Sequence, residues 1–146
     1  MVLTVRDYVL FGVLLLVDQV TKWLARSLDP HGPIFSLVHN TGAGFGILQG
    51  QNTLLLLVSI AVLVVLYRTV QSSTRHEKYA YVILYAGICG NAIDRIVLGA
   101  VTDFISIGSF PVFNAADSYI TVSILYLVAT GLRESFSSWN FRRKKK

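Results

Sequence analysis

The sequence predicts an all-α membrane protein with four transmembrane helices and a small hairpin or sheet outside the bilayer. Hydrophobic residues make up 53% of the 146 residues, only 14% are charged, and the mean hydropathy is +0.58. A soluble domain of this length could not bury so much apolar surface in one core, and soluble proteins carry about 25% charged residues. A lipid-facing surface accounts for both observations, and the length predicts one domain over residues 1–146.

Four apolar runs are long enough to cross a membrane. They cover residues 8–28, 53–70, 79–98 and 115–132. At 1.5 Å per residue, about 20 helical residues span a hydrocarbon core of about 30 Å. The first run could be a signal peptide, but it contains Asp18, Lys22 and Arg26, and no small-residue cleavage site follows it. We therefore interpret it as a retained span.

The distribution of basic residues predicts the orientation of the spans. The Lys and Arg residues that flank the second, third and fourth runs are Arg68, Arg75, Lys78, Arg133 and the tail 142–146. The segments 29–52 and 99–114 contain neither Lys nor Arg. Positively charged connections stay in the cytoplasm, so both termini and the 71–78 connection are predicted to be cytoplasmic. The two segments without basic residues are predicted to face outward.

The net charge of +5 does not indicate a nucleic-acid partner. Five of the thirteen Lys and Arg residues occupy positions 142–146, directly after an apolar run. Nucleic-acid-binding surfaces combine a basic stripe with interleaved aromatic residues, and the sequence has none. We interpret the tail as a cytoplasmic anchor against anionic lipid headgroups, which makes membrane lipids the expected partner.

The outward segment 99–114 predicts a short hairpin or small sheet at the membrane surface. Residues 101–107, VTDFISI, alternate partly and are rich in β-branched side chains. Gly108-Ser109 then provides a turn signal.

Polar residues gather where the predicted spans meet the outer interface, and polar groups in lipid need partners or a function. Asp18 and Lys22 are four residues apart, so they share a helix face and can pair. Asn91 and Arg95 have the same spacing, and Gly87 on their stripe would let another helix approach closely. A purely structural role remains open for the first pair, and an interface-anchor role for the second.

Two aspartates at the predicted outer interface, Asp103 in the outward segment and Asp117 at the start of the fourth run, have no obvious basic partner. Asn114 is a favourable N-cap and Asp117 suits the first turn of the helix that follows. Two adjacent carboxylates cannot both ionise cheaply, so they share one proton. One can then activate a water while the other acts as the acid. Alternatively, Asp103 is a solvated surface acid, Asp117 is only a helix-start acid, and Asp94 pairs with Arg95 or lies at the surface.

Other catalytic chemistries lack their residues. The histidines of the outer segment, His31 and His39, do not have the spacing of metal ligands. No G-x-S-x-G elbow is present, and Cys89 lies alone in an apolar run. We therefore predict peptide-bond hydrolysis by two aspartates, with no metal and no cofactor.

Five motifs occur in order along the chain: DQVTK at 18–22, NTGAGFGIL at 40–48, GNAIDR at 90–95, VTDF at 101–104 and FNAADS at 113–118. Through these motifs the chain resembles the signal peptidase II family over nearly its whole length. The resemblance implies an aspartic endopeptidase of the bacterial cytoplasmic membrane with its active site facing outward. It would remove the signal peptide from prolipoproteins, cutting before a diacylglyceryl-modified cysteine. The implied fold adds an extracytoplasmic β-cradle to four transmembrane helices.

The resemblance also implies roles for individual residues. It assigns catalysis to Asp103 and Asp117. It assigns substrate binding or support of the pair to Asp18, Lys22, Asn40, Asn91, Arg95, Asn114 and Ala116. The expected partners are the prolipoprotein substrate, membrane lipids and globomycin-type inhibitors.

Two other functions would also place polar residues in a small membrane protein. A proton or ion relay needs polar groups throughout the membrane depth, but the cytoplasmic halves of the four runs are nearly free of charge. A non-catalytic assembly factor could use Gly87 and other small residues for helix packing. It would not explain two outward acids beside amides.

Overall fold

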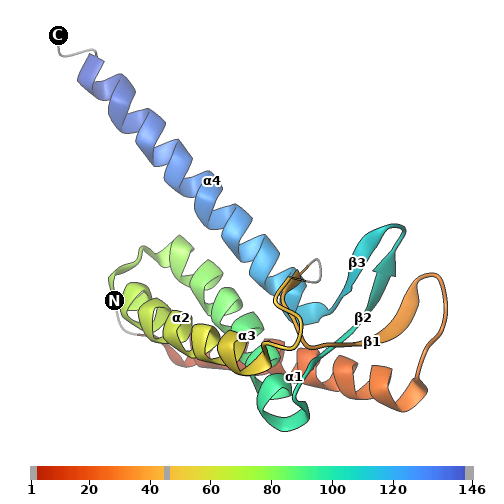
Figure 1. Cartoon of the computed structure of the whole chain (residues 1–146). Coiled ribbons are helices and arrows are strands. Elements are labelled where there is room, and N and C mark those ends of the chain that lie inside the picture. The colour runs from red at the N-terminus through yellow and green to blue at the C-terminus, as the bar shows by residue number, and fades with distance from the viewer. Residues whose placement is uncertain (1–2, 45–46, 144–146) are drawn as a thin grey trace.

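The computed structural model describes residues 3–44 and 47–143, apart from the side chains of residues 75–76 and 134–143. Within these residues the chain forms four long helices and a three-stranded antiparallel sheet (Figure 1). The helices are α1 (Val5–Leu28), α2 (Asn52–Ser72), α3 (Arg75–Leu98) and α4 (Ala115–Arg143). The strands are β1 (Phe35–Asn40), β2 (Val101–Ile107) and β3 (Phe110–Phe113). The predicted fold class is confirmed.

All four helices are long and apolar enough to cross a membrane, and each predicted run lies within one of them. α3 is the central helix and packs against the other three. Accordingly, 44% of its most apolar window is buried, compared with 17% in α1 and 11% in α2 and α4. Large apolar side chains on all four helices are exposed, as expected for a surface solvated by lipid.

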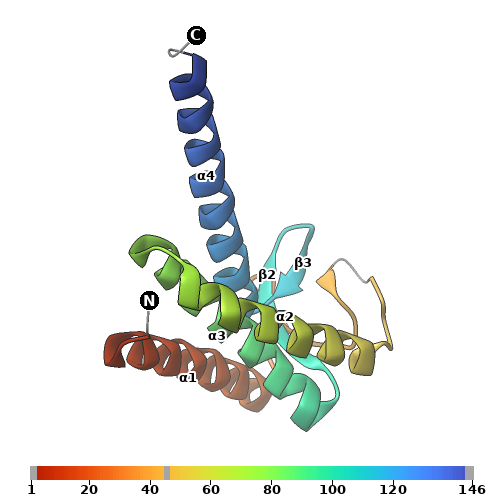
Figure 2. The same cartoon turned by 90° about the vertical axis from the view of Figure 1, so that its left-hand side faces the viewer.

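α4 diverges from the other three helices toward its C-terminal end, and Figure 2 shows the same divergence from a second direction. Its first turns are packed tightly against α3. A Cβ atom at Gly87 would lie 2.6 Å from the carbonyl oxygen of Ala116 and 2.9 Å from Cγ1 of Ile120. The predicted role of Gly87, close approach of a neighbouring helix, is therefore confirmed.

We expect Gly87→Ala to lower the melting temperature in detergent, because the backbone of Ala116 cannot move aside without separating α3 from α4. Overpacking of this kind costs about 1–3 kcal/mol. Gly12→Ala is the matched control, since a Cβ atom at Gly12 meets nothing within 4 Å. That variant should gain up to about 1 kcal/mol from helix propensity. Equal effects of the two substitutions would contradict the packing of α4 on Gly87.

The sheet lies at one end of the helix bundle, where α1 and α3 end (Figure 1). Its strand order is β1-β2-β3, with Val38 opposite Asp103 and Asn40 opposite Val101. β2 and β3 form the predicted hairpin, and Gly108 adopts a positive φ of 55° in its turn. β1 comes from the other segment that lacks Lys and Arg, 29–52, so both of these segments meet in one sheet.

A buried ion pair closes the opposite end of the bundle. Lys78 Nζ in the first turn of α3 lies 2.7 Å from Asp7 Oδ2 in the first turn of α1, and both side chains are 2% exposed. The helices α1 and α3 are thus fixed to each other at the end that lies far from the sheet.

Candidate active site

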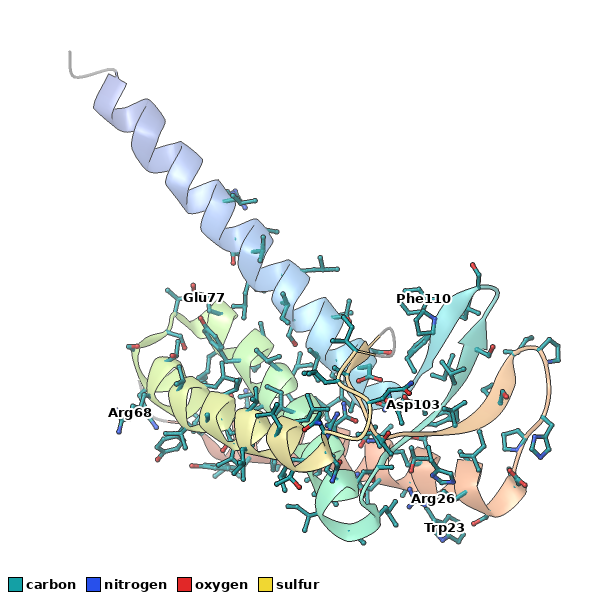
Figure 3. All side chains as sticks on the ribbon, in the orientation of Figure 1. Trp23, Arg26, Arg68, Glu77, Asp103 and Phe110 are labelled. Carbon is teal, nitrogen blue, oxygen red and sulfur yellow. The ribbon has the colours of Figure 1, made fainter. Side chains whose placement is uncertain are left out.

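A cavity of about 710 Å³ lies between the sheet and the adjoining ends of α3 and α4. Asp103 and Asp117 both line it, and so do Asn40, Asn91 and Arg95. Asp103 lies where the sheet meets the helix ends (Figure 3). The sequence-predicted catalytic pair therefore shares one cavity.

Asn114 connects the two aspartates. Its Nδ2 donates a 2.6 Å hydrogen bond to Asp103 Oδ1. Its Oδ1 accepts a 3.0 Å bond from the backbone N–H of Asp117, while its own N–H donates to Asp117 Oδ2 at 3.2 Å. This reciprocal arrangement is a helix N-cap that also fixes the Asp117 carboxylate. The predicted N-cap role of Asn114 is confirmed, and its side chain is fully buried.

Each carboxylate also accepts a hydrogen bond from the side-chain amide of another asparagine. Asn40 Nδ2 donates to Asp103 Oδ2 at 2.9 Å, and Asn91 Nδ2 donates to Asp117 Oδ1 at 2.8 Å. These donors come from β1 and α3, so three separate segments hold the two acids in place. Asp103 is only 1% exposed. The alternative in which Asp103 is a solvated surface acid is therefore wrong.

The pKa of Asp103 is raised to about 6, mainly by burial and also by the nearby negative charge of Asp117, against the lowering effect of the hydrogen bonds from Asn40 and Asn114. A carboxyl with this pKa holds its proton far above the usual carboxyl range of about 4. Asp103 can therefore serve as the protonated member of an acid pair in mildly acidic to near-neutral solution.

Lys22 supplies the positive charge behind the pair. Its Nζ lies 3.0 Å from Asp18 Oδ2 and 3.5 Å from Asp94 Oδ2, and all three side chains are at most 2% exposed. It also donates to Asn91 Oδ1 at 2.9 Å, which orients the Asn91 amide toward Asp117. The predicted Asp18–Lys22 pair is confirmed.

Asp18 and Ala116 join α1 to the start of α4. Asp18 Oδ1 accepts a 2.9 Å hydrogen bond from the backbone N–H of Ala116, which is one of the N–H groups left free at a helix N-terminus. Ala116 is fully buried, and a Cβ atom at Gly90 would lie 3.4 Å from its methyl group. The small side chain at 116 allows this three-helix contact.

Asp94 differs from its expectation. It was expected to pair with Arg95 or to lie at the surface, but it is 1% exposed and lies beside Lys22. Adjacent helix residues do not face each other, so Asp94 points toward α1 while Arg95 points toward the cavity. Asp94 Oδ2 also accepts the backbone N–H of Thr102 at 2.8 Å.

Arg95 holds the loop that follows β1. Its Nη2 donates to the carbonyl oxygen of Gly42 at 3.1 Å, and the N–H of Gly42 donates to Asn40 Oδ1 at 2.9 Å. Asn52 at the start of α2 donates to the carbonyl oxygen of Arg95 at 3.1 Å. Arg95 therefore contacts the loop that follows β1 instead of extending to headgroups as an interface anchor.

Two residues near the site have no counterpart in the sequence expectations. They are Arg26 and Thr102: Arg26 Nη1 donates to Thr102 Oγ1 at 2.8 Å, and Thr102 is fully buried next to Asp103. The one signal in the sequence is that Arg26 follows Lys22 by four residues on α1, which places both on the same helix face.

Comparison with known proteins identifies relatives of this chain by sequence and by fold. A family model described as signal peptidase (SPase) II matches residues 10–133. A lipoprotein signal peptidase of Dehalococcoides mccartyi is 40% identical over 137 residues, covering 84% of this chain and 86% of that protein. One of Shouchella clausii is 37% identical over 130 residues, covering 80% and 86%.

The fold is also similar to that of a bacterial membrane enzyme solved by the in meso method. The TM-score is 0.82 at 27% identity, and the alignment covers 89% of each chain. The fold, the aspartate-lined cavity and the matches over most of the sequence agree, and the chain belongs to the signal peptidase II family of membrane proteases.

Proposed function

We propose that Asp103 and Asp117 cleave the peptide bond as a proton-sharing pair. The observation that carries this proposal is the position of both carboxylates on one cavity, joined through Asn114. The ionised carboxylate removes a proton from a water, whose oxygen attacks the peptide carbonyl. The protonated carboxyl donates to the carbonyl oxygen, and the C–N bond then breaks as the leaving nitrogen takes a proton. Asn40 and Asn91 hold the carboxylates in position for this reaction.

The substrates of this family are prolipoproteins, from which the signal peptide is removed. The finer proposal is a cut directly before a diacylglyceryl-modified cysteine. The cavity supports it, because apolar residues of the sheet, Val38, Val101 and Val112, line it together with Ile120 and Val122 of α4. Val122 is 63% exposed on a membrane-spanning helix. The acyl chains can thus stay in lipid, where each buried CH₂ contributes about 0.8 kcal/mol.

The protein is a multi-pass bacterial membrane protein. We infer that both termini face the cytoplasm and that the cavity opens outward. The positive-inside distribution supports this orientation. So does the arrangement of the chain, since the start of α1 and the end of α4 both lie away from the sheet (Figure 1). A reporter fused after Lys146 should be active only in the cytoplasm, and activity only outside the cell would contradict this orientation.

The test of function uses purified protein in detergent with a diacylglyceryl-modified precursor peptide and its unmodified twin. We expect cleavage of the modified peptide alone, directly before the modified cysteine, and inhibition by a globomycin-type compound. Cleavage of both peptides at equal rates would contradict the proposed lipid recognition. Cleavage of neither would contradict the proposed activity.

The pH dependence of cleavage follows from the raised pKa of Asp103. The reaction needs one protonated and one ionised carboxyl, so activity is lost when the shared proton dissociates. We expect a bell-shaped profile of kcat/KM whose alkaline limb lies near pH 6, where Asp103 loses its proton. A profile that keeps rising from pH 6 to pH 9 would contradict the proton-sharing pair.

A further inference from the structure

Thr102, the residue before Asp103 in β2, is held from outside the sheet by two charged side chains. Its backbone N–H donates to Asp94 Oδ2 on α3 at 2.8 Å. Its Oγ1 accepts a 2.8 Å hydrogen bond from Arg26 Nη1 on α1. Thr102 is fully buried, so water cannot replace either contact. The strand is therefore fixed to two helices at the residue that adjoins Asp103.

Adjacent side chains of a strand point to opposite faces of the sheet. Thr102 points toward α1 and α3, while Asp103 points into the cavity toward Asn40 and Asn114. A shift of the backbone at Thr102 moves the Asp103 carboxyl with it, since one peptide bond joins them. In Figure 3, Arg26 lies on α1, below Asp103 at the junction of the sheet with the helix ends.

Arg26 is itself well placed to act as a fixed support. It lies in the last turn of α1, where the helix dipole favours a cation. Its Nη1 is also 3.9 Å from Asp94 Oδ1, so the same guanidinium contacts the carboxylate that holds the Thr102 backbone. Only 27% of the Arg26 side chain is exposed. Arg26, Asp94 and Thr102 thus form one contact between α1, α3 and β2.

The packing of α1 on α3 does not depend on this contact. The Asp7–Lys78 pair holds the two helices at the far end, and Lys22 bonds to Asn91 in between. Loss of the Arg26 guanidinium therefore leaves the bundle assembled and removes one of the two helix contacts at the start of β2.

We propose that Arg26 is a positioning residue for peptide hydrolysis, which sets the place of the Asp103 carboxyl through Thr102. This inference rests on the catalytic role proposed for Asp103. The effect of Arg26 on the pair is indirect, because it passes through the side chain and backbone of Thr102.

The test is a double-mutant cycle on cleavage of the diacylglyceryl-modified peptide, with Arg26→Met, Thr102→Val and the double variant. We expect each single change to lower kcat about tenfold with KM within about twofold, because small displacements of a catalytic group cost rate rather than binding. The double variant should be no slower than the slower single variant, since both changes break the same contact. Arg26→Lys should recover part of the loss.

The controls remove the same side chains elsewhere. Arg68→Met removes an exposed arginine of α2, and Thr69→Val removes a hydroxyl that bonds within its own helix, to the Val65 carbonyl. Both should keep kcat within about twofold of the parent. The melting temperature in detergent is measured for every variant, and rates are expressed per folded protein.

A second readout separates positioning from stability. Thr102→Val changes no charge, so a displaced alkaline limb in its pH profile reports a changed environment of the Asp103 carboxyl. We expect the limb to move, with kcat lowered, in folded protein. Three outcomes would each overturn the inference: unchanged kcat in both single variants, multiplicative losses in the double variant, or losses that vanish once rates are expressed per folded protein, with an unmoved limb. Full activity of Asp103→Asn would instead refute the catalytic pair on which the inference rests.

Discussion

Asp103→Asn and Asp117→Asn should each abolish cleavage of the lipid-modified peptide, with a loss of about 10³-fold or more. General acid–base catalysis contributes about 10²–10⁴-fold, and an amide can neither take nor give the proton. The loss should appear in kcat, since the cavity and its apolar lining stay in place. The double variant should be no slower than either single variant, because the two acids act as a unit.

The matched control for these variants is Asp29→Asn, which removes an exposed acid directly after the C-terminal end of α1. It should leave kcat unchanged within about twofold. Retention of parental activity by either Asp103→Asn or Asp117→Asn, in protein that melts cooperatively, would refute the catalytic assignment. Such a result would leave the family membership and the fold as they are.

Lys22→Met should destabilise the protein strongly. Lys22 lies between two buried carboxylates, Asp18 and Asp94; in the variant Asp18 loses its counter-charge, and Asp94 keeps only the more distant guanidinium of Arg26. Breaking a buried ion pair by removing one partner costs about 3–5 kcal/mol. Asn91 also loses the donor that orients its amide toward Asp117, so residual activity in folded protein should fall as well.

Lys78→Met is the matched comparison, because Lys78 is equally buried but serves one carboxylate. Its partner, Asp7, keeps hydrogen bonds from the backbone and hydroxyl of Thr4. Thermal unfolding in detergent should therefore show a larger loss for Lys22→Met than for Lys78→Met. Adding Asp94→Asn to Lys22→Met should restore part of the stability, since one buried negative charge without its Lys22 partner is removed. The reverse order of the two lysine variants would contradict the charge arrangement around Lys22.

The helices could be predicted from sequence because the bilayer imposes a strong local constraint. Each span must be a continuous apolar run, and each run has only one reasonable structure in lipid. The β2–β3 hairpin could also be predicted from sequence, since its alternation and its Gly108 turn lie within one short segment. Strand β1 could not be predicted, because its pairing with β2 joins residues more than sixty positions apart, as in Val38 opposite Asp103.

The site was predictable to the extent that its residues repeat at helical spacing or stand in recognisable motifs. Asp18 and Lys22 pair as their four-residue spacing indicates, and Asn114 caps α4 by accepting the backbone N–H of Asp117. Spacing gave the wrong partner for Asp94, since its actual neighbours, Lys22 and Thr102, lie on other elements. The role of Arg26 could not be predicted for the same reason: its contact with Thr102 exists only once α1 and β2 are assembled.

Electrostatic coupling of Asp103 to Asp117 can be measured by infrared titration of the protonated carboxyl C=O band, in the parent protein and in Asp117→Asn. We expect a band in the parent that disappears near pH 6, that is absent from Asp103→Asn, and that titrates at lower pH once the charge of Asp117 is removed. An Asp103 band that titrates near pH 4 in the parent, unmoved by Asp117→Asn, would contradict the coupling of the two carboxyls.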